Sequence, residues 1–386
     1  KFNENAFSDF FIKGHMDHGE NTFFNDIKSL PPAKYKIVSQ NSDKEKYYWN
    51  LGDVKKDKSL GIKKTKIKLK GLFNNAIQEH LESDVEIGSC LSGGNDSSSI
   101  SSKSNSLLNY KMKTFTYEFK DQVSNINSET FLAAKFAKNN KMKNFTAIVN
   151  PKYVLDKFDE LLINVESPIT SLRLFGIKKL YEEVKKQNIK VMLEGHGGDE
   201  MTAGYKYNYL PYLLDKNKIK QSSDYLKIKD KLKKNESFNL TRDMFSTLNY
   251  QGLSTTDGIP NFYSSIFSKD FLNSYKIDYK RDTILQDDLN KKYGFLKRSQ
   301  YSDIKNIKIP RILKYTDRLS MNFSVESRVP LLDNNLFSYL YNLDGNLKFY
   351  KNQTRYIFKR SLKNEKISDF FTDKKKTIVD PQSLWL

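Results

Sequence analysis

Short apolar runs and longer stretches with helical spacing alternate along the middle of the chain. The runs, rich in β-branched and aromatic residues, are typical of buried strands and cover residues 85–91, 113–119, 145–149 and 189–193. Apolar positions at helical spacing occupy residues 72–81, 128–139, 154–165 and 175–186. Strands that alternate with helices predict an α/β fold, in which helices cover both faces of a parallel sheet.

The flanking segments have weaker patterns. Residues 1–50 predict short strands and turns, because Pro31 and Pro32 force an extended turn and remove two hydrogen-bond donors. Residues 55–70 are dominated by Lys and predict a solvated linker. Residues 206–298 predict a helical scaffold, with helical patches at 210–214 and 262–271.

Composition limits the class of protein. The chain has 386 residues, of which 38% are hydrophobic and 13% aromatic, so it can bury a core and is not a disordered chain. Its net charge of +19 makes nucleic-acid binding one explanation to consider. However, the Lys residues are spread through Asn-, Ile-, Phe- and Tyr-rich sequence, which favours a compositional bias as the origin of the charge. A single cysteine, Cys90, excludes a disulfide framework. No apolar run approaches the ~20 residues of a membrane span, and we expect a cytoplasmic protein.

The stretch Leu91–Ser98 (Leu-Ser-Gly-Gly-Asn-Asp-Ser-Ser) joins the first predicted strand to a helix start. Glycines let the backbone approach an anion, and the N–H groups of such a loop and helix N-terminus point at it. It is not a Walker loop, because no Gly-Lys-Ser/Thr follows. The alternatives are therefore another kind of phosphate loop and a plain Gly-Gly turn.

A second glycine-rich stretch, Glu194–Glu200, follows the strand that ends at Leu193. In parallel sheets, ligands bind beyond the carboxyl ends of the strands, so both stretches are expected at one edge of the sheet. Mg²⁺ takes one or two protein carboxylates and fills its shell with phosphate oxygens and water. Asp96 and Asp199 are the candidate pair. Alternatively, Asp199 and Glu200 are acidic residues that favour a helix N-terminus.

A third informative stretch lies at 309–333. It places five charged residues in an apolar context, namely Asp317, Arg318, Glu326, Arg328 and Asp333. We expect most of them to form a buried ion-pair network and a fraction to face the site. Near the C-terminus, Lys374–Lys376 alone is typical of a solvated face, and His80 is typical of a packed histidine.

With these stretches in order, the chain resembles the synthetase part of glutamine-dependent asparagine synthetases. The same domain serves β-lactam synthetases, lasso-peptide cyclases and sugar-amidating enzymes. The matching motifs lie at 91–98, 195–205, 317–321 and 326–333. The resemblance implies a PP-loop ATP pyrophosphatase fold (adenine nucleotide α-hydrolase-like) with a helical C-terminal part over 71–386. It also implies a linker at 55–70 and, at 1–54, a short β remnant of an Ntn-type amidotransferase domain.

The resemblance also implies a reaction and a site. ATP adenylates a carboxylate, with aspartate as the default acceptor, and ammonia then displaces AMP, with Mg²⁺ between Asp96 and Asp199. The implied nucleotide-binding residues are Leu91, Ser92, Gly93, Gly94, Asp96, Ser97, Ser98, Tyr117, Glu194 and Gly195. The implied catalytic residues are Lys375, Asp96, Asp199, His196 and Glu200, with Lys374 and Lys376 as alternatives to Lys375.

Three departures from the family pattern matter. The glutaminase half needs an N-terminal Cys, but the chain starts at Lys1, so we expect that this domain was cut away or that ammonia comes from free ammonium or a partner. His196 stands where many members carry Glu or Gln, which leaves the acceptor open, although a neutral His can orient a nucleophile. Lys375 is not followed by the usual x-Gly-Phe.

Other functions stay open at this point. A sugar or peptide carboxylate in a surface-polysaccharide or natural-product pathway is the second acceptor class. A tRNA-modifying or RNA-binding PP-loop protein would show a clustered basic face, but relatives of that kind lack the 317–333 block. A catalytically inactive scaffold would release no pyrophosphate. We expect a small-molecule partner, no membrane or nucleic-acid partner, and a homodimer as an allowed assembly.

Overall fold

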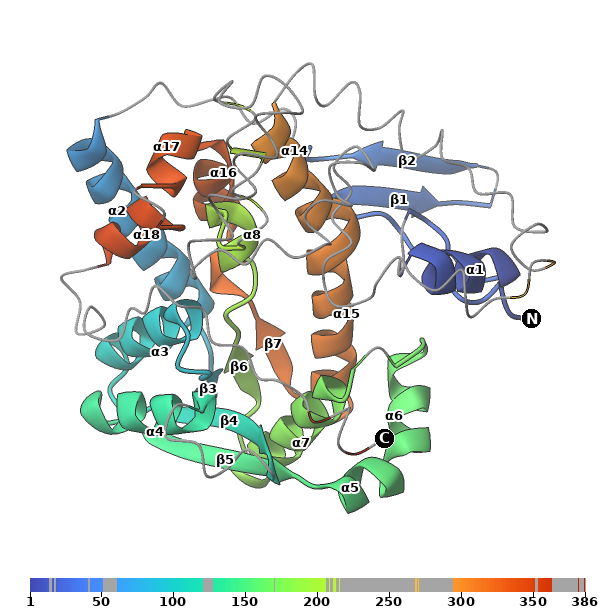
Figure 1. Ribbon diagram of the computed structural model, residues 1–386, viewed down its shortest axis with the longest axis horizontal. Helices are drawn as coiled ribbons and strands as arrows, with labels where there is room; N and C mark the ends of the chain where they lie inside the picture. Colours follow the sequence, from blue (N-terminus) through green and yellow to red (C-terminus); the bar gives the residue numbers. More distant parts are fainter. Residues whose placement is uncertain are drawn as a thin grey trace. The chain divides into compact units, whose positions relative to one another are not determined.

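A computed structural model of the chain separates into two compact units (Figure 1). Unit 1 comprises Lys1–Lys56 and Ala203–Arg311, and unit 2 comprises Asp57–Thr202 and Ile312–Leu386. The residues described are 1–13, 16, 19–40, 42–50, 61–120, 128–169, 171–205, 208, 211–212, 215, 268, 270, 294–350, 353–362, 381 and 385. Most of the predicted scaffold at 206–298 therefore lies outside the described residues.

Unit 2 is built on a five-stranded sheet in the order β5-β4-β3-β6-β7. Its strands are β3 (Ile87–Cys90), β4 (Lys113–Phe119), β5 (Lys143–Val149), β6 (Val191–Leu193) and β7 (Glu326–Arg328). Every neighbouring pair is parallel, which confirms the predicted fold class. The sequence pattern did not predict β7, because its three residues are polar and carry no apolar alternation.

The strand order reverses at β3. From β3 the chain moves to β4 and β5, and then crosses to β6 on the other side of β3. In open parallel sheets such a switch point leaves a crevice outside the carboxyl ends of the two diverging strands. The stretches 91–98 and 194–200 follow β3 and β6, so both begin at this crevice.

Helices cover both faces of the sheet, because successive side chains of a strand point to opposite sides. On one face, Ser89 of β3 contacts Ser101 of α3 (Asn95–Leu107), with 2.9 Å between their hydroxyl oxygens. On the other face, Phe115 of β4 joins a buried cluster with Tyr181 and Val184 of α7 (Arg173–Lys186).

The other helices of unit 2 are α2 (Ile62–His80), α4 (Glu129–Asn139), α5 (Pro151–Asp156), α6 (Phe158–Val165), α8 (Gly198–Thr202), α16 (Asn334–Asn342), α17 (Gly345–Lys348) and α18 (Tyr356–Ser361), with a 3₁₀ turn at Pro330–Leu332. Helix α15 (Lys308–Met321) crosses the unit boundary along the sequence. The helix predicted at 154–165 is two helices, because the backbone leaves helical angles at Lys157 (φ −113°, ψ 9°).

Helix α2 begins at Ile62, inside the Lys-rich segment expected as a linker. Thr65, Leu69 and Phe73 recur at every fourth position and are buried, while the lysines between them occupy the other faces. The high Lys content concealed this narrow apolar stripe. The domain boundaries expected from the sequence remain a prediction.

Unit 1 contains α1 (Glu4–Lys13), the antiparallel pair β1 (Lys34–Val38) and β2 (Asp43–Tyr47), α14 (Phe295–Ser302) and a π-helical turn at Asp303–Ile307. The prediction of only strands and turns over 1–50 is wrong for α1. The Asn3 side chain accepts a hydrogen bond from the Ala6 N–H (3.2 Å), and the Phe7 ring packs 4.9 Å from that of Phe23. A capping residue and one apolar face therefore form a helix here.

Among the described residues, none of the helices combines the length and the apolar character that a bilayer crossing requires.

Candidate active site

The loop after β3 is shaped by its own serines. The Ser92 N–H donates to Ser97 Oγ (3.1 Å), and the Gly94 N–H donates to Ser92 Oγ (3.2 Å). Gly94 caps helix α3 and offers no side-chain acceptor. Because the first N–H groups of a helix have no partner within it, this end of α3 suits a phosphate group.

Gly93 makes the turn of this loop possible. Its φ is +72°, a left-handed conformation that L side chains rarely adopt. A Cβ atom at this position would also lie 2.8 Å from the Cβ of Leu132 in α4. The loop is thus pressed against α4, and only glycine fits there.

The loop after β6 packs directly against the first loop. The Glu194 N–H donates to the Arg328 carbonyl (2.8 Å), which extends the pairing of β6 with β7 by one step. A Cβ atom on Gly198 would overlap the carboxylate of Asp96. The missing side chain at Gly198 therefore lets Asp96, from the β3 loop, approach the start of α8.

Arg355 joins the two candidate carboxylates. Its Nη1 donates to Asp96 Oδ2 (2.9 Å) and to Asp199 Oδ1 (2.9 Å), and its Nη2 contacts Asp96 Oδ1. The side chain is 6% exposed, and the residue stands just before α18 with φ +60°. The structure thus brings Asp96 and Asp199 together through an arginine that the sequence did not reveal, and their role as metal ligands stays a prediction.

The electrostatics of Arg355 are dominated by these carboxylates. Burial alone would lower the pKa of the guanidinium, but Asp96 and Asp199 together raise that pKa above its ordinary value. Its Nε is buried and has no hydrogen-bond partner among the described residues. The contact is therefore a buried, permanently charged ion pair with one donor unused.

The donor set fits a magnesium ion that also binds phosphate. One nitrogen of Arg355 reaches both carboxylates, so a single cation can contact Asp96 and Asp199 at once. Among the described residues, no group of three or more His, Cys, Asp or Glu side chains could hold a metal ion. Two carboxylates suffice for Mg²⁺ when phosphate oxygens and water complete its shell.

Glu194 lies in a buried hydrogen-bond network. Tyr181 donates its hydroxyl to Glu194 Oε1 (2.6 Å), and the Cys90 thiol donates to the same oxygen (3.1 Å). Burial, reinforced by the Glu194 carboxylate, raises the pKa of both donors well above their ordinary values. Both groups therefore stay protonated, and Glu194 Oε1 acts as their common acceptor.

His196 faces the other oxygen of Glu194. Its Nε2 lies 3.6 Å from Glu194 Oε2 and 3.2 Å from Thr316 Oγ1, and the His196 side chain is 25% exposed. Two oxygens thus converge on the same ring nitrogen. Thr316 stands next to the predicted motif at 317–321, but nothing in the sequence paired it with His196.

The remaining predicted residues have diverse surroundings. The Leu91 carbonyl accepts a hydrogen bond from Thr116 (2.6 Å), and the buried Ser98 hydroxyl has no hydrogen-bond partner within the described part of the chain. The ring of Tyr117 packs so closely on Gly176 of α7 that a Cβ there would overlap it. Glu200 is buried in α8. Lys374, Lys375 and Lys376 lie outside the described residues, and the nucleotide-binding roles stay predictions.

The charged residues at 317–333 do not form one buried network. Arg318 pairs with Glu166 (2.5 Å) on half-exposed side chains, and Arg328 pairs with Glu326 (2.7 Å). Asp333 instead caps α16, where its side chain accepts the first N–H groups of the helix. The prediction of a buried ion-pair network was wrong. These residues lie near the surface, where water can solvate their charges, so they do not need the ion-pair partners that buried charges require.

A parallel α/β sheet with two glycine-rich loops at its switch point is the arrangement of the open, ligand-binding α/β class. The sequence profile described as asparagine synthase matches residues 68–385, and the chain belongs to the asparagine synthase family.

Curated relatives extend over most of the chain. The amidase chyE of Penicillium rubens is 25% identical, over 94% of this chain and 60% of its own length. A glutamine-hydrolysing asparagine synthetase of Bacillus subtilis is 23% identical, over 87% of this chain and 52% of its own length. The chain thus spans between about half and three fifths of these relatives.

Similar solved structures include the NH3-dependent NAD synthetase of Campylobacter jejuni and the U34-tRNA thiolase of Methanococcus maripaludis. The first is 18% identical over 38% of this chain and 61% of its own, with a TM-score of 0.26. The second is 14% identical over 68% of this chain and 80% of its own, with a TM-score of 0.28.

Proposed function

We propose that the chain is the synthetase part of an ATP-dependent, amide-forming ligase that releases AMP and pyrophosphate. The convergence of Asp96 and Asp199 beside the glycine loop, at the switch point of the sheet, carries this proposal. Membership of the asparagine synthase family supports the ligase class. Aspartate is the acceptor that we favour.

The proposed chemistry has two steps. A carboxylate oxygen of the acceptor attacks the α-phosphorus of ATP, and pyrophosphate leaves with the electron pair of the broken P–O bond. Ammonia then attacks the acyl carbon, loses a proton, and AMP leaves. The loop at Ser92–Ser97 and the start of α3 would bind phosphate oxygens through backbone N–H groups and hydroxyls.

Positive charge is the second requirement of this reaction, because negative charge develops on the leaving pyrophosphate. Asp96 and Asp199 would hold a Mg²⁺ ion, which supplies that neutralisation when bound. Arg355 already lies between the two carboxylates, and its unused Nε–H is a further donor for a phosphate oxygen. Lys375 is proposed as a further cation from its place in the sequence alone.

The test is release of pyrophosphate from ATP with Mg²⁺, ammonium and a panel of carboxylates. Asp96→Asn should lower the release by about 100-fold or more, since it removes one carboxylate of the metal pair. Asp156→Asn, an exposed acidic residue of α5, is the matched control and should retain full release. The proposal would be refuted if the wild type released no pyrophosphate with any carboxylate of the panel. Equal release by Asp96→Asn and Asp156→Asn would also refute it.

A different acceptor is the second candidate. His196 replaces the Glu or Gln of many family members, and a relative similar over 94% of the chain is named an amidase. Both observations leave room for an acceptor other than aspartate, such as a carboxylate on a sugar or peptide. Release that depends on such a compound, and not on aspartate, would identify this class.

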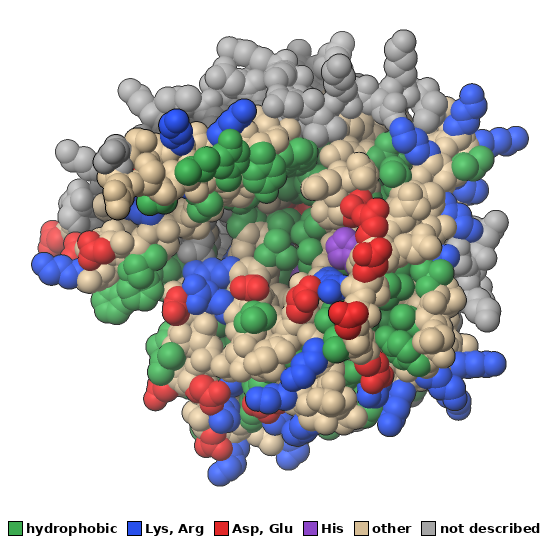
Figure 2. Space-filling model, turned by 180° about the vertical axis from the view of Figure 1, so that it is seen from behind, with side chains coloured by type: hydrophobic (Ala, Val, Ile, Leu, Met, Phe, Trp, Pro, Cys, Tyr) green, Lys and Arg blue, Asp and Glu red, His purple; other side chains and the backbone are tan. Residues whose placement is uncertain are grey.

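The RNA-binding alternative predicts a clustered basic face. On the face drawn in Figure 2, the Lys and Arg side chains of the described residues are interspersed with Asp and Glu. Phosphate contacts by dispersed, partly neutralised cations favour weak and non-specific binding. This face therefore gives the RNA-binding alternative no support, whereas the family match supports the ligase proposal.

A further inference from the structure

Glu194 and His196 flank Gly195 immediately after β6, beside the phosphate loop. A Cβ atom on Gly195 would lie 3.1 Å from the Ser97 backbone nitrogen, so this turn contacts the start of α3. The Glu194 carboxylate is buried, and the His196 ring next to it is accessible at one quarter of its surface. A buried carboxylate therefore lies next to an imidazole ring that solvent can reach.

The two carboxylate oxygens of Glu194 have different neighbours. Oε1 accepts from Tyr181 (2.6 Å) and from Cys90 (3.1 Å), and both donors stay protonated. Oε2 faces His196 Nε2. Because the donors hold Oε1, the carboxylate cannot rotate without leaving two buried donors unpaired, which is costly.

The His196 ring is therefore oriented by its neighbours. A neutral imidazole carries one N–H, and the other nitrogen is an acceptor. Nε2 lies beside a carboxylate oxygen, which can only accept, and beside the Thr316 hydroxyl, which can do either. This arrangement favours the proton on Nε2. Among the described residues, Nδ1 has no hydrogen-bond partner, so its lone pair is available.

We propose that Glu194 is a positioning residue that fixes the Nε2–H tautomer of His196, so that Nδ1 receives the proton lost by the nitrogen nucleophile. This inference rests on the proposed ligase function. As nitrogen forms the bond to the acyl carbon, its proton moves to Nδ1, and AMP leaves with the electron pair of the broken C–O bond. The acid–imidazole pair works by the logic of a hydrolase triad, with nitrogen in place of a hydroxyl.

Glu194→Gln provides a sharp test. Tyr181 and Cys90 demand an acceptor, so the Gln amide must turn its carbonyl toward them and its NH2 toward His196. That NH2 donates to Nε2 and moves the ring proton to Nδ1. The chain has four histidines, so spectra of ring-¹⁵N-labelled protein at alkaline pH resolve the tautomer, and His196→Gln assigns the signal.

The tautomer is measured without ATP and is independent of the ligase proposal. We expect Nε2–H in the wild type and in the control Glu183→Gln, and Nδ1–H in Glu194→Gln. The same tautomer in wild type and Glu194→Gln would overturn the inference. A thermal melt shows whether the variant folds. If it does not, Tyr181→Phe, which keeps the carboxylate but loosens it, should give a mixture of tautomers, and a pure Nε2–H signal there would overturn it.

Measuring adenylation and amide formation separately distinguishes a positioning role of Glu194 from a general loss of activity. Exchange of labelled pyrophosphate into ATP, with acceptor and no nitrogen source, reports adenylation alone. Glu194→Gln should slow amide formation by about 100-fold more than it slows this exchange. An equal loss in both would refute the positioning role. Absence of exchange in the wild type would instead refute the ligase proposal.

Discussion

Arg355 is the residue on which the two candidate metal ligands converge. Replacement by Met removes the cation from between Asp96 and Asp199 and leaves the carboxylates in a buried setting. Breaking a buried ion pair on one side typically costs about 3–5 kcal/mol. We expect Arg355→Met to lower the free energy of unfolding by that order, as measured by urea denaturation.

Magnesium provides the decisive comparison for this variant. If Asp96 and Asp199 can hold a metal, Mg²⁺ should restore part of the lost stability in Arg355→Met and change the wild type less. Arg360→Met, at an exposed position of α18 with its guanidinium over the Tyr356 ring, is the matched control. A variant that Mg²⁺ leaves unchanged would argue against a metal site at this pair.

At the scale of single residues, local motifs could be predicted and long-range partners could not. The glycines and carboxylates of both loops follow strands, so their place at the sheet edge was predictable. Arg355 and Tyr181 reach the site from distant elements, and neither belongs to a motif. These contacts depend on how α7 and α18 pack in the fold. The hydrophobic periodicity of a sequence can predict a helix but not which distant residues it meets.

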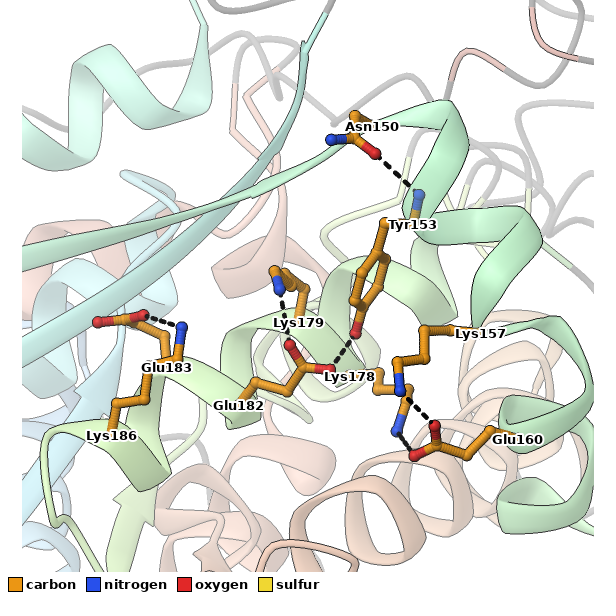
Figure 3. Close-up of polar contacts among 9 residues, drawn as sticks. All are labelled: Asn150, Tyr153, Lys157, Glu160, Lys178, Lys179, Glu182, Glu183 and Lys186. Carbon is orange, nitrogen blue, oxygen red and sulfur yellow. Dashed lines mark hydrogen bonds and ion pairs between the residues drawn. The ribbon is translucent and has the colours of Figure 1, made fainter.

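At the scale of elements, two polar clusters tie α5 and α6 to α7 (Figure 3). Glu182 accepts from the Tyr153 hydroxyl (2.5 Å) and from Lys179 (2.7 Å). Glu160 accepts from Lys157 (2.8 Å) and from Lys178 (2.6 Å). The Lys178 side chain is 0% exposed, whereas the Glu160 side chain is 44% exposed. The buried ammonium group is therefore paired with a carboxylate that is partly in contact with solvent.

Glu160→Gln should therefore destabilise the fold in a pH-dependent way. Contacts with Lys157 and Lys178 lower the pKa of Glu160, so its contribution is present above its unfolded pKa and is lost as the pH falls through its folded pKa. We expect a loss of about 1–2 kcal/mol at neutral pH, discounted for the exposure of Glu160, that disappears in acid. Urea denaturation across the pH range measures it.

The matched control for this pair is Lys157→Gln. Lys157 contacts the same carboxylate but is 40% exposed, and an exposed pair contributes about 0–1 kcal/mol. We expect the loss of the Glu160 carboxylate, a partner of the buried Lys178, to cost more than the loss of the exposed Lys157. A larger loss from Lys157→Gln than from Glu160→Gln, or a Glu160→Gln effect that persists in acid, would contradict this expectation.

The elements themselves were predictable where periodicity was strong. Strand β4 coincides with its prediction, because its aromatic and β-branched residues alternate. Helices α1 and α2 were missed or shortened, since their apolar stripes are narrow and lie in polar sequence. The predicted scaffold at 206–298 stays a prediction, because its residues lie outside those described.

At the scale of the whole molecule, the candidate site belongs to one unit. Every described residue of the site, from the β3 loop to Arg355, lies in unit 2. Unit 1 has its own aromatic cluster around Phe23 and the pair β1 and β2, in which almost every residue is exposed. A ligand that binds only the folded state stabilises the part that it contacts, by about 2.7 kcal/mol at 100 times its Kd.

Hydrogen exchange can therefore locate the ligand. Saturating ATP with Mg²⁺ should slow amide exchange in β3, β6 and the first turn of α3. Exchange in β1 and β2, which belong to unit 1, should not change. Asp96→Asn should abolish the protection, because this variant lacks one of the two candidate metal ligands. Equal protection of β1 and β2, or protection that survives in Asp96→Asn, would mean that ATP binds elsewhere. Protection confined to the strand ends would connect the switch point of the sheet to nucleotide binding without any assay of turnover.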